Sequence, residues 1–93
     1  MADSEVVHRE AAHRFEIRIG DAIAFLNYRP GTGKLTLIHT EVPHALQEHG
    51  IGGKLAQAAF DYARSAGLRV NPLCPFAAAW VAKHPEYADL VVH

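Results

Sequence analysis

The stretch QEHGIGGKLAQAAFDYARSAG, residues 47–67, contains both the loop and the helix that decide the fold. Gly50, Gly52 and Gly53 fall within four residues, and apolar residues then recur at three- and four-residue spacing. Such spacing is typical of an amphipathic helix, and Gly67 suits the left-handed cap that ends one. We therefore predict a helix over residues 51–66, entered through a glycine-rich loop.

The chain before this loop alternates between apolar and polar residues. Residues 13–19, 22–28 and 34–42 are predicted strands, joined by turns at Gly20-Asp21 and at RPGTG, so the first half is an antiparallel meander. Regular alternation in the third strand puts one set of side chains on one face and a second set on the other. The first set is Leu35, Leu37, His39 and Glu41, and the second is Thr36, Ile38, Thr40 and Val42.

The chain after the helix completes a β-α-β unit. The segment of residues 68–73 is short and apolar, as expected of a buried strand. A C-terminal helix follows, with Pro75 in its first turn; residues 76–83 continue the helix, and Pro85 ends it. Strands joined in this way run parallel, with a right-handed crossover. The predicted fold class is thus α/β (α+β), with residues 13–93 as a single domain after a flexible, polar lead-in over residues 1–12.

Charge, composition and residue spacing disfavour several classes of function. A net charge of -1 over 93 residues disfavours an extended nucleic-acid partner, and no apolar run approaches the roughly 18 residues of a membrane span. The first ten residues lack a secretory pattern, and a single cysteine cannot form an internal disulfide, so we expect a reducing, cytoplasmic-type compartment. His39, His44 and His49 fall five apart, which fits neither strand nor helix, so we expect no metal site.

The topology brings distant residues together. Parallel strands end at the same edge of a sheet, so His39, Thr40, Glu41, the glycine loop and Cys74 are expected to converge there. Glycines let the backbone N–H groups face one point, and the helix start adds its positive end, which suits a pyrophosphate. A tight turn packed against the sheet is the alternative explanation of the loop.

Two familiar phosphate loops fail on spacing. A dinucleotide fingerprint that begins at Gly50 needs Gly or Ala at position 55, where the chain has Leu55. A P-loop ending in Gly53-Lys54 needs glycine where the chain has Glu48, and Ser or Thr where it again has Leu55. The sequence therefore disfavours NAD, ATP and GTP as the ligand.

The residues Gln47-x-x-Gly50-x-Gly52 resemble the Q/R-x-x-G-x-G/A motif of GCN5-related N-acetyltransferases, which holds the pyrophosphate of acetyl coenzyme A. The segments HTEVP, NPLCPF and HPEY are similar to those of the small, single-domain branch of that superfamily, over residues 15–91. The resemblance implies a minimal acyl-CoA N-acyltransferase fold with splayed parallel strands and acetyl coenzyme A as cosubstrate. It implies a cofactor site that comprises Glu41, Val42, Gln47, Glu48, His49, Gly50, Ile51, Gly52, Gly53 and Lys54.

Acetyl transfer to an amine needs a base for the amine and a proton for the departing thiolate. His39 and Glu41 are candidates for the base, directly or through water. Cys74 lies at a predicted helix start, where the dipole favours a thiolate, and is the candidate to protonate the leaving group or to carry the acetyl group itself. The alternative for Cys74 is a buried small hydrophobe.

The function predicted is transfer of acetyl from acetyl coenzyme A to an amine on a protein, peptide or small molecule. The alternatives are a non-catalytic acyl-CoA binding module and, third, a Cys-His hydrolase. Phe76 and Trp80 are expected in the core, Tyr87 either in the core or in a pocket, and five histidines at the surface or capping helices. These histidines are His8, His13, His44, His84 and His93.

Overall fold

The computed structural model describes residues 5–92, so the prediction for His93 and that for residues 1–4 lie outside the described residues. A single five-stranded sheet has the order β1-β2-β3-β4-β5, antiparallel except for the parallel pair β4 and β5. The elements are β1 (Val6–Arg9), η2 (Glu10–Ala12), β2 (Arg14–Ile19), β3 (Ala22–Gly31), β4 (Lys34–Glu41), η3 (His44–His49), α1 (Ile51–Ala66), β5 (Arg69–Pro72), α2 (Pro75–Ala82) and η4 (Pro85–Leu90).

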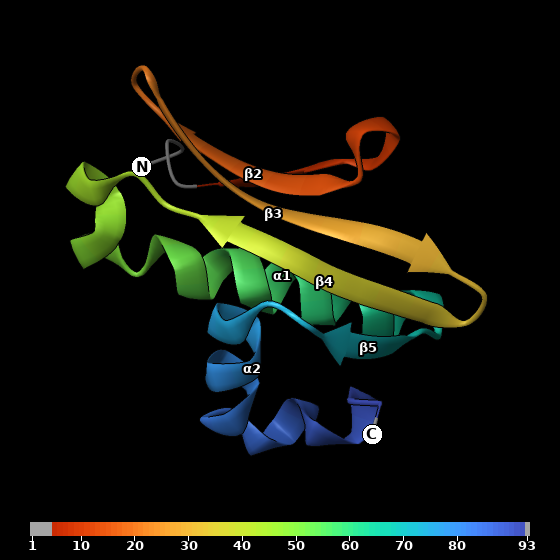
Figure 1. Cartoon of the computed structure of the whole chain (residues 1–93). Helices are drawn as coiled ribbons and strands as arrows, with labels where there is room; N and C mark the ends of the chain where they lie inside the picture. Colours follow the sequence, from red (N-terminus) through yellow and green to blue (C-terminus); the bar gives the residue numbers. More distant parts are fainter. Residues whose placement is uncertain (1–4, 93) are drawn as a thin grey trace.

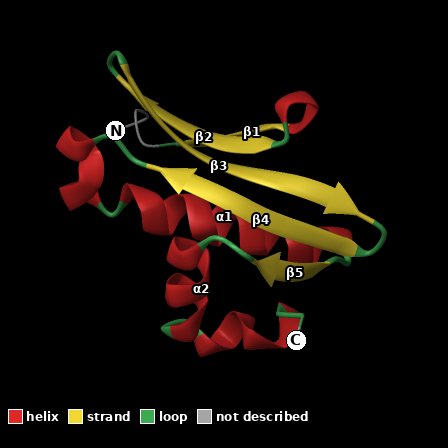
Figure 2. Cartoon of the chain, viewed as in Figure 1, coloured by secondary structure: helices red, strands yellow, loops and turns green. Residues whose placement is uncertain are grey.

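Helix α1 lies along one face of the sheet, while α2 and η4 continue beyond β5 (Figures 1 and 2). The core forms between α1 and this face, where Leu55 and Phe60 of the helix and Leu26 and Leu37 of the strands are fully buried. Burial of each such side chain contributes about 1.5–3 kcal/mol to stability. Packing of one helix face against alternate strand residues is therefore the main source of stability.

The fold class predicted from the sequence is confirmed, including the antiparallel meander, the β-α-β unit and the C-terminal helix. Helix α1 has the predicted bounds. Its C-cap Gly67 adopts φ 72°, and the Gly67 N–H donates to the carbonyls of Ala63 and Arg64. A left-handed glycine cap thus ends the helix, as the spacing predicted.

The predicted lead-in differs from the structure over residues 6–12. Residues 6–9 form β1, which pairs with β2 through Val6 and Ile17 and through His8 and Phe15. The His8 ring stacks on Phe15 with centroids 4.2 Å apart and is hydrogen-bonded to the Tyr28 hydroxyl, so His8 is partly buried and packed, and is not the free surface residue that we expected. The sequence of β1 has no clear alternation of apolar and polar residues. The packing of His8 against aromatic rings holds this strand against β2.

A β-bulge in β4 reverses the predicted faces of its last residues. Asn27 pairs with His39 and Tyr28 pairs with Leu37, which leaves Ile38 as an extra residue on β4. One extra residue shifts the alternation by one position. Thr40 therefore lies on the α1 side together with Leu37, and His39 lies on the opposite face, so the prediction that His39 and Glu41 share a face with Leu35 and Leu37 is wrong.

Candidate functional site

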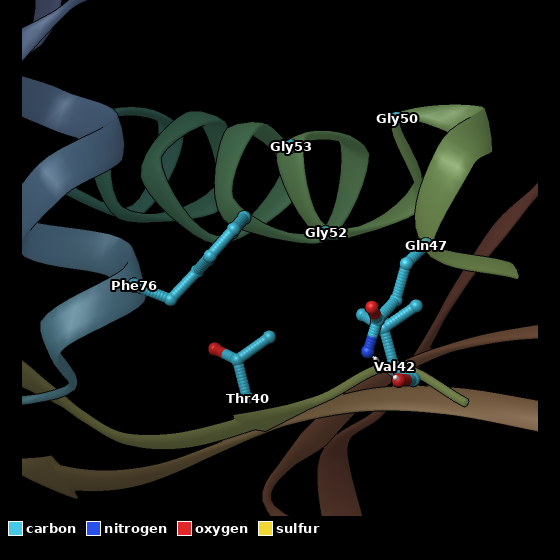
Figure 3. A pocket seen from close by; sticks show the side chains of 7 residues that line it. All are labelled: Thr40, Val42, Gln47, Gly50, Gly52, Gly53 and Phe76. Carbon is cyan, nitrogen blue, oxygen red and sulfur yellow. Dashed lines mark hydrogen bonds between the residues drawn. The ribbon is translucent and has the colours of Figure 1, made fainter. Parts of the chain in front are cut away.

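Strands β4 and β5 separate at the carboxyl end of the sheet. Their pairing ends at Leu37 and Pro72, and the N–H of Cys74 donates to the carbonyl of Leu37 over 2.9 Å. Beyond this point β4 continues to Glu41, whereas the other chain segment turns into α2. A cavity of about 440 Å³ lies here, and Figure 3 shows the seven residues that line it: Thr40, Val42, Gln47, Gly50, Gly52, Gly53 and Phe76.

The glycine loop places the start of α1 at this cavity. Gly50 has φ 66° and joins η3 to α1 as the N-cap, and no side chain of the described residues caps the helix. The first intrahelical bond runs from the Lys54 N–H to the Gly50 carbonyl, so the N–H groups of Ile51, Gly52 and Gly53 have no partner within the helix. Such a helix start is suited to an anionic oxygen.

Packing also explains two of the glycines. A Cβ atom on Gly52 would lie 2.6 Å from Cζ of Phe76, and one on Gly53 would lie 3.4 Å from Nε1 of Trp80. Gly52 therefore lets the Phe76 ring lie directly against α1. Loop and packing requirements coincide here, so the tight-turn explanation and the anion-site explanation apply to the same residues.

The other predicted cofactor residues lie in different surroundings. The amide of Gln47 donates to the carbonyl of Val42 over 3.1 Å and so ties the loop to the end of β4. The side chain of Ile51 is buried in the core, so only the backbone N–H of this residue is left to contact a ligand. Lys54 is exposed. The side chains of Glu48 and His49 lie outside the described residues.

Cys74 lies across the gap from Thr40. Its thiol is buried, with 3% of the residue exposed, and Sγ is 3.3 Å from Oγ1 of Thr40. Cys74 is the N-cap of α2, and Pro75 occupies the first turn of that helix. The thiol thus has a hydroxyl partner and a position at a helix N-terminus, where the dipole favours negative charge.

His39 and Glu41 lie on the other face of the sheet. Nε2 of His39 is 3.2 Å from Oε1 of Glu41, and the two side chains are 57% and 63% exposed. They flank Thr40 in sequence, so the backbone of β4 separates this pair from the cavity. The expected convergence therefore holds for Thr40, Cys74 and the loop but does not hold for the side chains of His39 and Glu41.

The sequence-based core placement of Phe76 is wrong. Phe76 is 43% exposed and lines the cavity, whereas Ala77 and Val81 are the buried residues of α2. The spacing of Cys74, Ala77 and Val81 already indicates this buried side, and Phe76 lies off it. Phe76 is the cavity residue that sequence reasoning missed, whereas Thr40 was expected at this edge of the sheet but was given no role there.

Trp80 and Tyr87 pack against the core. Trp80 stacks on Phe60 with centroids 5.5 Å apart, which agrees with its predicted place, and the Tyr87 hydroxyl donates to Asp61 over 2.6 Å. The pKa of Tyr87 is raised, chiefly by this hydrogen bond. A second, smaller cavity of about 250 Å³ is lined by Phe76, Ala79, Trp80 and Lys83. The Phe76 ring thus borders two neighbouring cavities.

The described part of the chain offers neither a metal cluster nor a membrane-spanning helix. Within residues 5–92, no group of three or more His, Cys, Asp and Glu side chains is arranged to hold a metal ion. No helix in the same residues combines the length and apolar character needed to cross a membrane.

Known proteins match this chain over the residues that form the site. A family model described as GCN5-related N-acetyl-transferase matches residues 14–90, which include the whole cavity and Cys74. The chain belongs to the GCN5-related N-acetyltransferase family. This N-acetyltransferase-family chain is 30% identical over 93 residues to Protein NATD1 of Danio rerio, covering 95% of the chain and 84% of that protein. It is 31% identical over 83 residues to Protein NATD1 of Bos taurus, covering 86% and 74%.

A solved structure of the family has the same fold. The NMR structure of a GCN5-like putative N-acetyltransferase from Staphylococcus aureus superposes with a TM-score of 0.77 at 28% identity. The match covers 99% of this chain and 91% of that one. The chain is thus a small member of the GCN5-related N-acetyltransferase superfamily, and its loop, cavity and cysteine lie within the shared fold.

Proposed function

We propose that the protein transfers an acetyl group from acetyl coenzyme A to an amine. The observation that carries this proposal is the cavity between the uncapped start of α1 and the separated end of β4, which is lined by Thr40, whose hydroxyl lies 3.3 Å from the buried Cys74 thiol. Family membership supports an acyltransferase. Acetyl coenzyme A supplies an activated acetyl thioester, and the remaining tasks belong to side chains and backbone of this chain.

The residues at the cavity suit coenzyme A in two ways. The N–H groups of Ile51, Gly52 and Gly53 are available for diphosphate oxygens, because the N-cap is a glycine with no side-chain acceptor. The end of β4 beyond Leu37 extends past the last pair with β5, so its backbone is available to pair with the amide groups of the pantetheine arm. Val42 and Phe76 provide apolar walls beside that path.

Cys74 is the proposed proton donor. When the amine nitrogen bonds to the acetyl carbon and the carbon–sulfur bond breaks, Cys74 gives its proton to the departing sulfur and is reprotonated after product release. The Thr40 hydroxyl, 3.3 Å away, holds the thiol in place and donates to it when it is ionised. In a second route, Sγ of Cys74 attacks the acetyl carbon and takes the acetyl group as a thioester, while coenzyme A leaves as the free thiol with the cysteine proton; the amine then displaces Sγ, which regains a proton.

The pair of His39 and Glu41 is the proposed acceptor of the amine proton. Both side chains are exposed on the face opposite the cavity, and they flank Thr40 along β4. This placement suits a reaction in which the cofactor approaches from the α1 side and the amine approaches from the opposite side. The amine proton then passes to Glu41 or His39, directly or through water.

The test is acetyl transfer to a panel of amines, followed by mass of the acetylated product, for the natural protein, Cys74→Ala and His39→Ala. We expect both variants to bind acetyl coenzyme A and Cys74→Ala to lose most of its activity. Equal rates for the natural protein and Cys74→Ala would remove Cys74 from the mechanism. Cofactor binding without transfer to any amine would indicate the non-catalytic binding module instead.

Intact mass after mixing with acetyl coenzyme A alone separates the two routes. A gain of one acetyl group that is absent in Cys74→Ala supports the acetyl-cysteine route. An unchanged mass under conditions that give turnover supports direct transfer.

A further inference from the structure

The sheet face opposite α1 carries most of the positive charge of the chain. Strand alternation and register place six of the nine lysine and arginine residues on this face, against two glutamates, within residues 5–92. The six are Arg9, Arg14, Arg18, Arg29, Lys34 and Arg69, and we call this surface the basic face. The whole chain has a net charge of -1, so the excess of positive charge on the basic face comes from the placement of these residues and does not reflect the overall composition.

The two glutamates on the basic face differ in their surroundings. Glu16 is buried between Arg9 and Arg14, with nitrogen–oxygen distances of 3.1 Å and 3.5 Å. Glu41 is 63% exposed and lies beside His39. Of the two, Glu41 is therefore the carboxylate that an incoming cation can reach.

The register places two arginines of β2 in the rows on either side of Glu41. Glu41 pairs with Phe25, and Phe25 pairs with Glu16, which defines one row across the strands. The next row on one side contains Arg18, and the next row on the other side contains Arg14; both are on β2, two strands or about 10 Å across the sheet from Glu41. Rows on one face are separated by two residues, or about 7 Å. A carboxylate thus lies in a row that has an arginine row on either side.

An apolar surface lies in the same row as Glu41. Phe25 is half-buried, and the guanidinium of Arg14 covers part of its ring at 4.0 Å from the centroid. The His39 ring lies 6.1 Å from that of Phe25. The methylene stem of a lysine can pack against such aromatic surface while its ammonium meets a carboxylate.

We propose that the basic face binds the acceptor, and that the acceptor is a lysine within an acidic, extended polypeptide segment. This inference rests on the proposed function, because it makes Glu41 the contact of the reacting amine. In an extended segment, residues two apart point to the same side and repeat at the spacing of the sheet rows. Acidic residues two positions before and after the lysine therefore fall in the rows of Arg18 and Arg14, and the Arg14 guanidinium extends from β2 over Phe25 of β3.

A nucleic acid fits this face less well than an acidic peptide. Its phosphates would meet Glu41 at the centre of the surface, whereas a peptide presents an ammonium there and carboxylates at the sides. Like charges placed opposite each other oppose binding, and complementary ones favour it. The acidic peptide is also the ligand that brings an amine to the site.

The test is fluorescence anisotropy with labelled peptides of the pattern Glu-X-Lys-X-Glu and matched peptides with Gln or Lys in place of both glutamates. We expect the acidic peptide to bind about tenfold more tightly than the basic one, with an advantage that falls as salt is raised. Equal affinities, or tighter binding of a labelled single-stranded oligonucleotide than of the acidic peptide, would overturn the proposal.

Matched variants locate the binding surface. Arg18→Gln is expected to weaken binding of the acidic peptide about threefold to fivefold. Arg64→Gln removes the same charge from α1, where Arg64 pairs with Asp89, and is expected to leave binding within about twofold. Equal losses in the two variants would contradict a localised surface, once circular dichroism has shown that both are folded.

Binding and transfer are measured separately, so the two proposals fail in different ways. Acetyl transfer at equal rates to the acidic, neutral and basic peptides contradicts the inference and leaves the transferase assignment standing. Ranked binding without any acetyl transfer supports the docking surface and contradicts the transferase assignment.

Discussion

The Thr40 hydroxyl and the Cys74 thiol are 3.3 Å apart and join β4 to the start of α2 where the two parallel strands separate. The last backbone hydrogen bond before the two segments separate joins Cys74 to Leu37. The side-chain contact between Thr40 and Cys74 is the next interaction between β4 and the start of α2. The bulge at Ile38 makes the contact possible, because without it Thr40 would point to the opposite face.

Replacement of Thr40 tests this contact. Thr40→Val keeps the shape but removes the hydroxyl, and we expect the transfer rate to fall about fivefold to tenfold, since one hydrogen bond contributes roughly 1 kcal/mol. Thr40→Ser keeps the hydroxyl and is expected to retain most of the rate. The measurement is the maximal rate at saturating acetyl coenzyme A. Equal rates in the Val and Ser variants would show that the hydroxyl plays no part.

Gly52→Ala tests the close approach of Phe76. Its Cβ would lie 2.6 Å from the Phe76 ring, which must then rotate away from α1 and change the cavity wall. The ring is partly exposed and can move, so we expect the free energy of unfolding to change by less than about 1 kcal/mol while acetyl coenzyme A affinity falls about tenfold. Affinity can be followed by the emission of Trp80, the single tryptophan.

Gly53→Ala is the control for this experiment. Both alanine variants retain the backbone N–H groups, but the nearest atom to a Cβ on Gly53 is Nε1 of Trp80 at 3.4 Å. We therefore expect a smaller loss of affinity in Gly53→Ala. A larger loss there than in Gly52→Ala would contradict the importance of the Phe76 contact.

Gly50 is required for its backbone conformation. With φ 66° and open space where a Cβ atom would lie, Gly50→Ala meets no clash but must adopt a left-handed conformation. We expect it to lower the free energy of unfolding by about 1 kcal/mol, and Gly50→Asn to cost less, because Asn adopts this conformation more readily. Urea unfolding measures both values, and an Ala variant as stable as the natural protein would contradict this explanation.

The partly buried ring of His8 makes stability depend on pH. Burial lowers the pKa of His8 from its ordinary value of 6.5, although nearby Glu10 acts in the opposite direction. The unfolded chain therefore takes up a proton more readily than the folded protein, so stability falls as pH drops through about 6.5 towards the lowered pKa. His8→Phe keeps an aromatic ring on Phe15 and cannot titrate.

The measurement is the melting temperature of both proteins at about pH 7.5 and pH 5.5, on either side of the ordinary histidine pKa. We expect the acid-induced decrease to be smaller in His8→Phe. An equal decrease in the two proteins would assign the pH dependence to other groups.

The sequence predicted the parts of the fold that follow from local patterns. Helix α1, its glycine cap and the β-α-β connection follow from the spacing of apolar residues and from the positions of glycine and proline. The bulge at Ile38 was not predictable, because one extra residue in a strand depends on its pairing partner and leaves the local alternation unchanged. The same holds for β1, whose residues pair and pack only once β2 and Tyr28 are in place.

The site was predicted only in part for the same reason. Cys74 and the glycine loop follow from chain topology, whereas the faces of His39, Thr40 and Glu41 depend on the bulge. Phe76 was assigned to the core because it is aromatic and helical, yet its place relative to Ala77 and Val81 puts it at the cavity.

Thermal unfolding with acetyl coenzyme A, compared with NAD and ATP, tests the central claim most directly. A ligand that binds only the folded state at about one hundred times its Kd adds roughly 2.7 kcal/mol, which for a domain of this size raises the melting temperature by about 10 °C or more. We predict such a rise with acetyl coenzyme A and little change with NAD or ATP. An unchanged melting temperature with acetyl coenzyme A, or an equal rise with all three, would contradict the account.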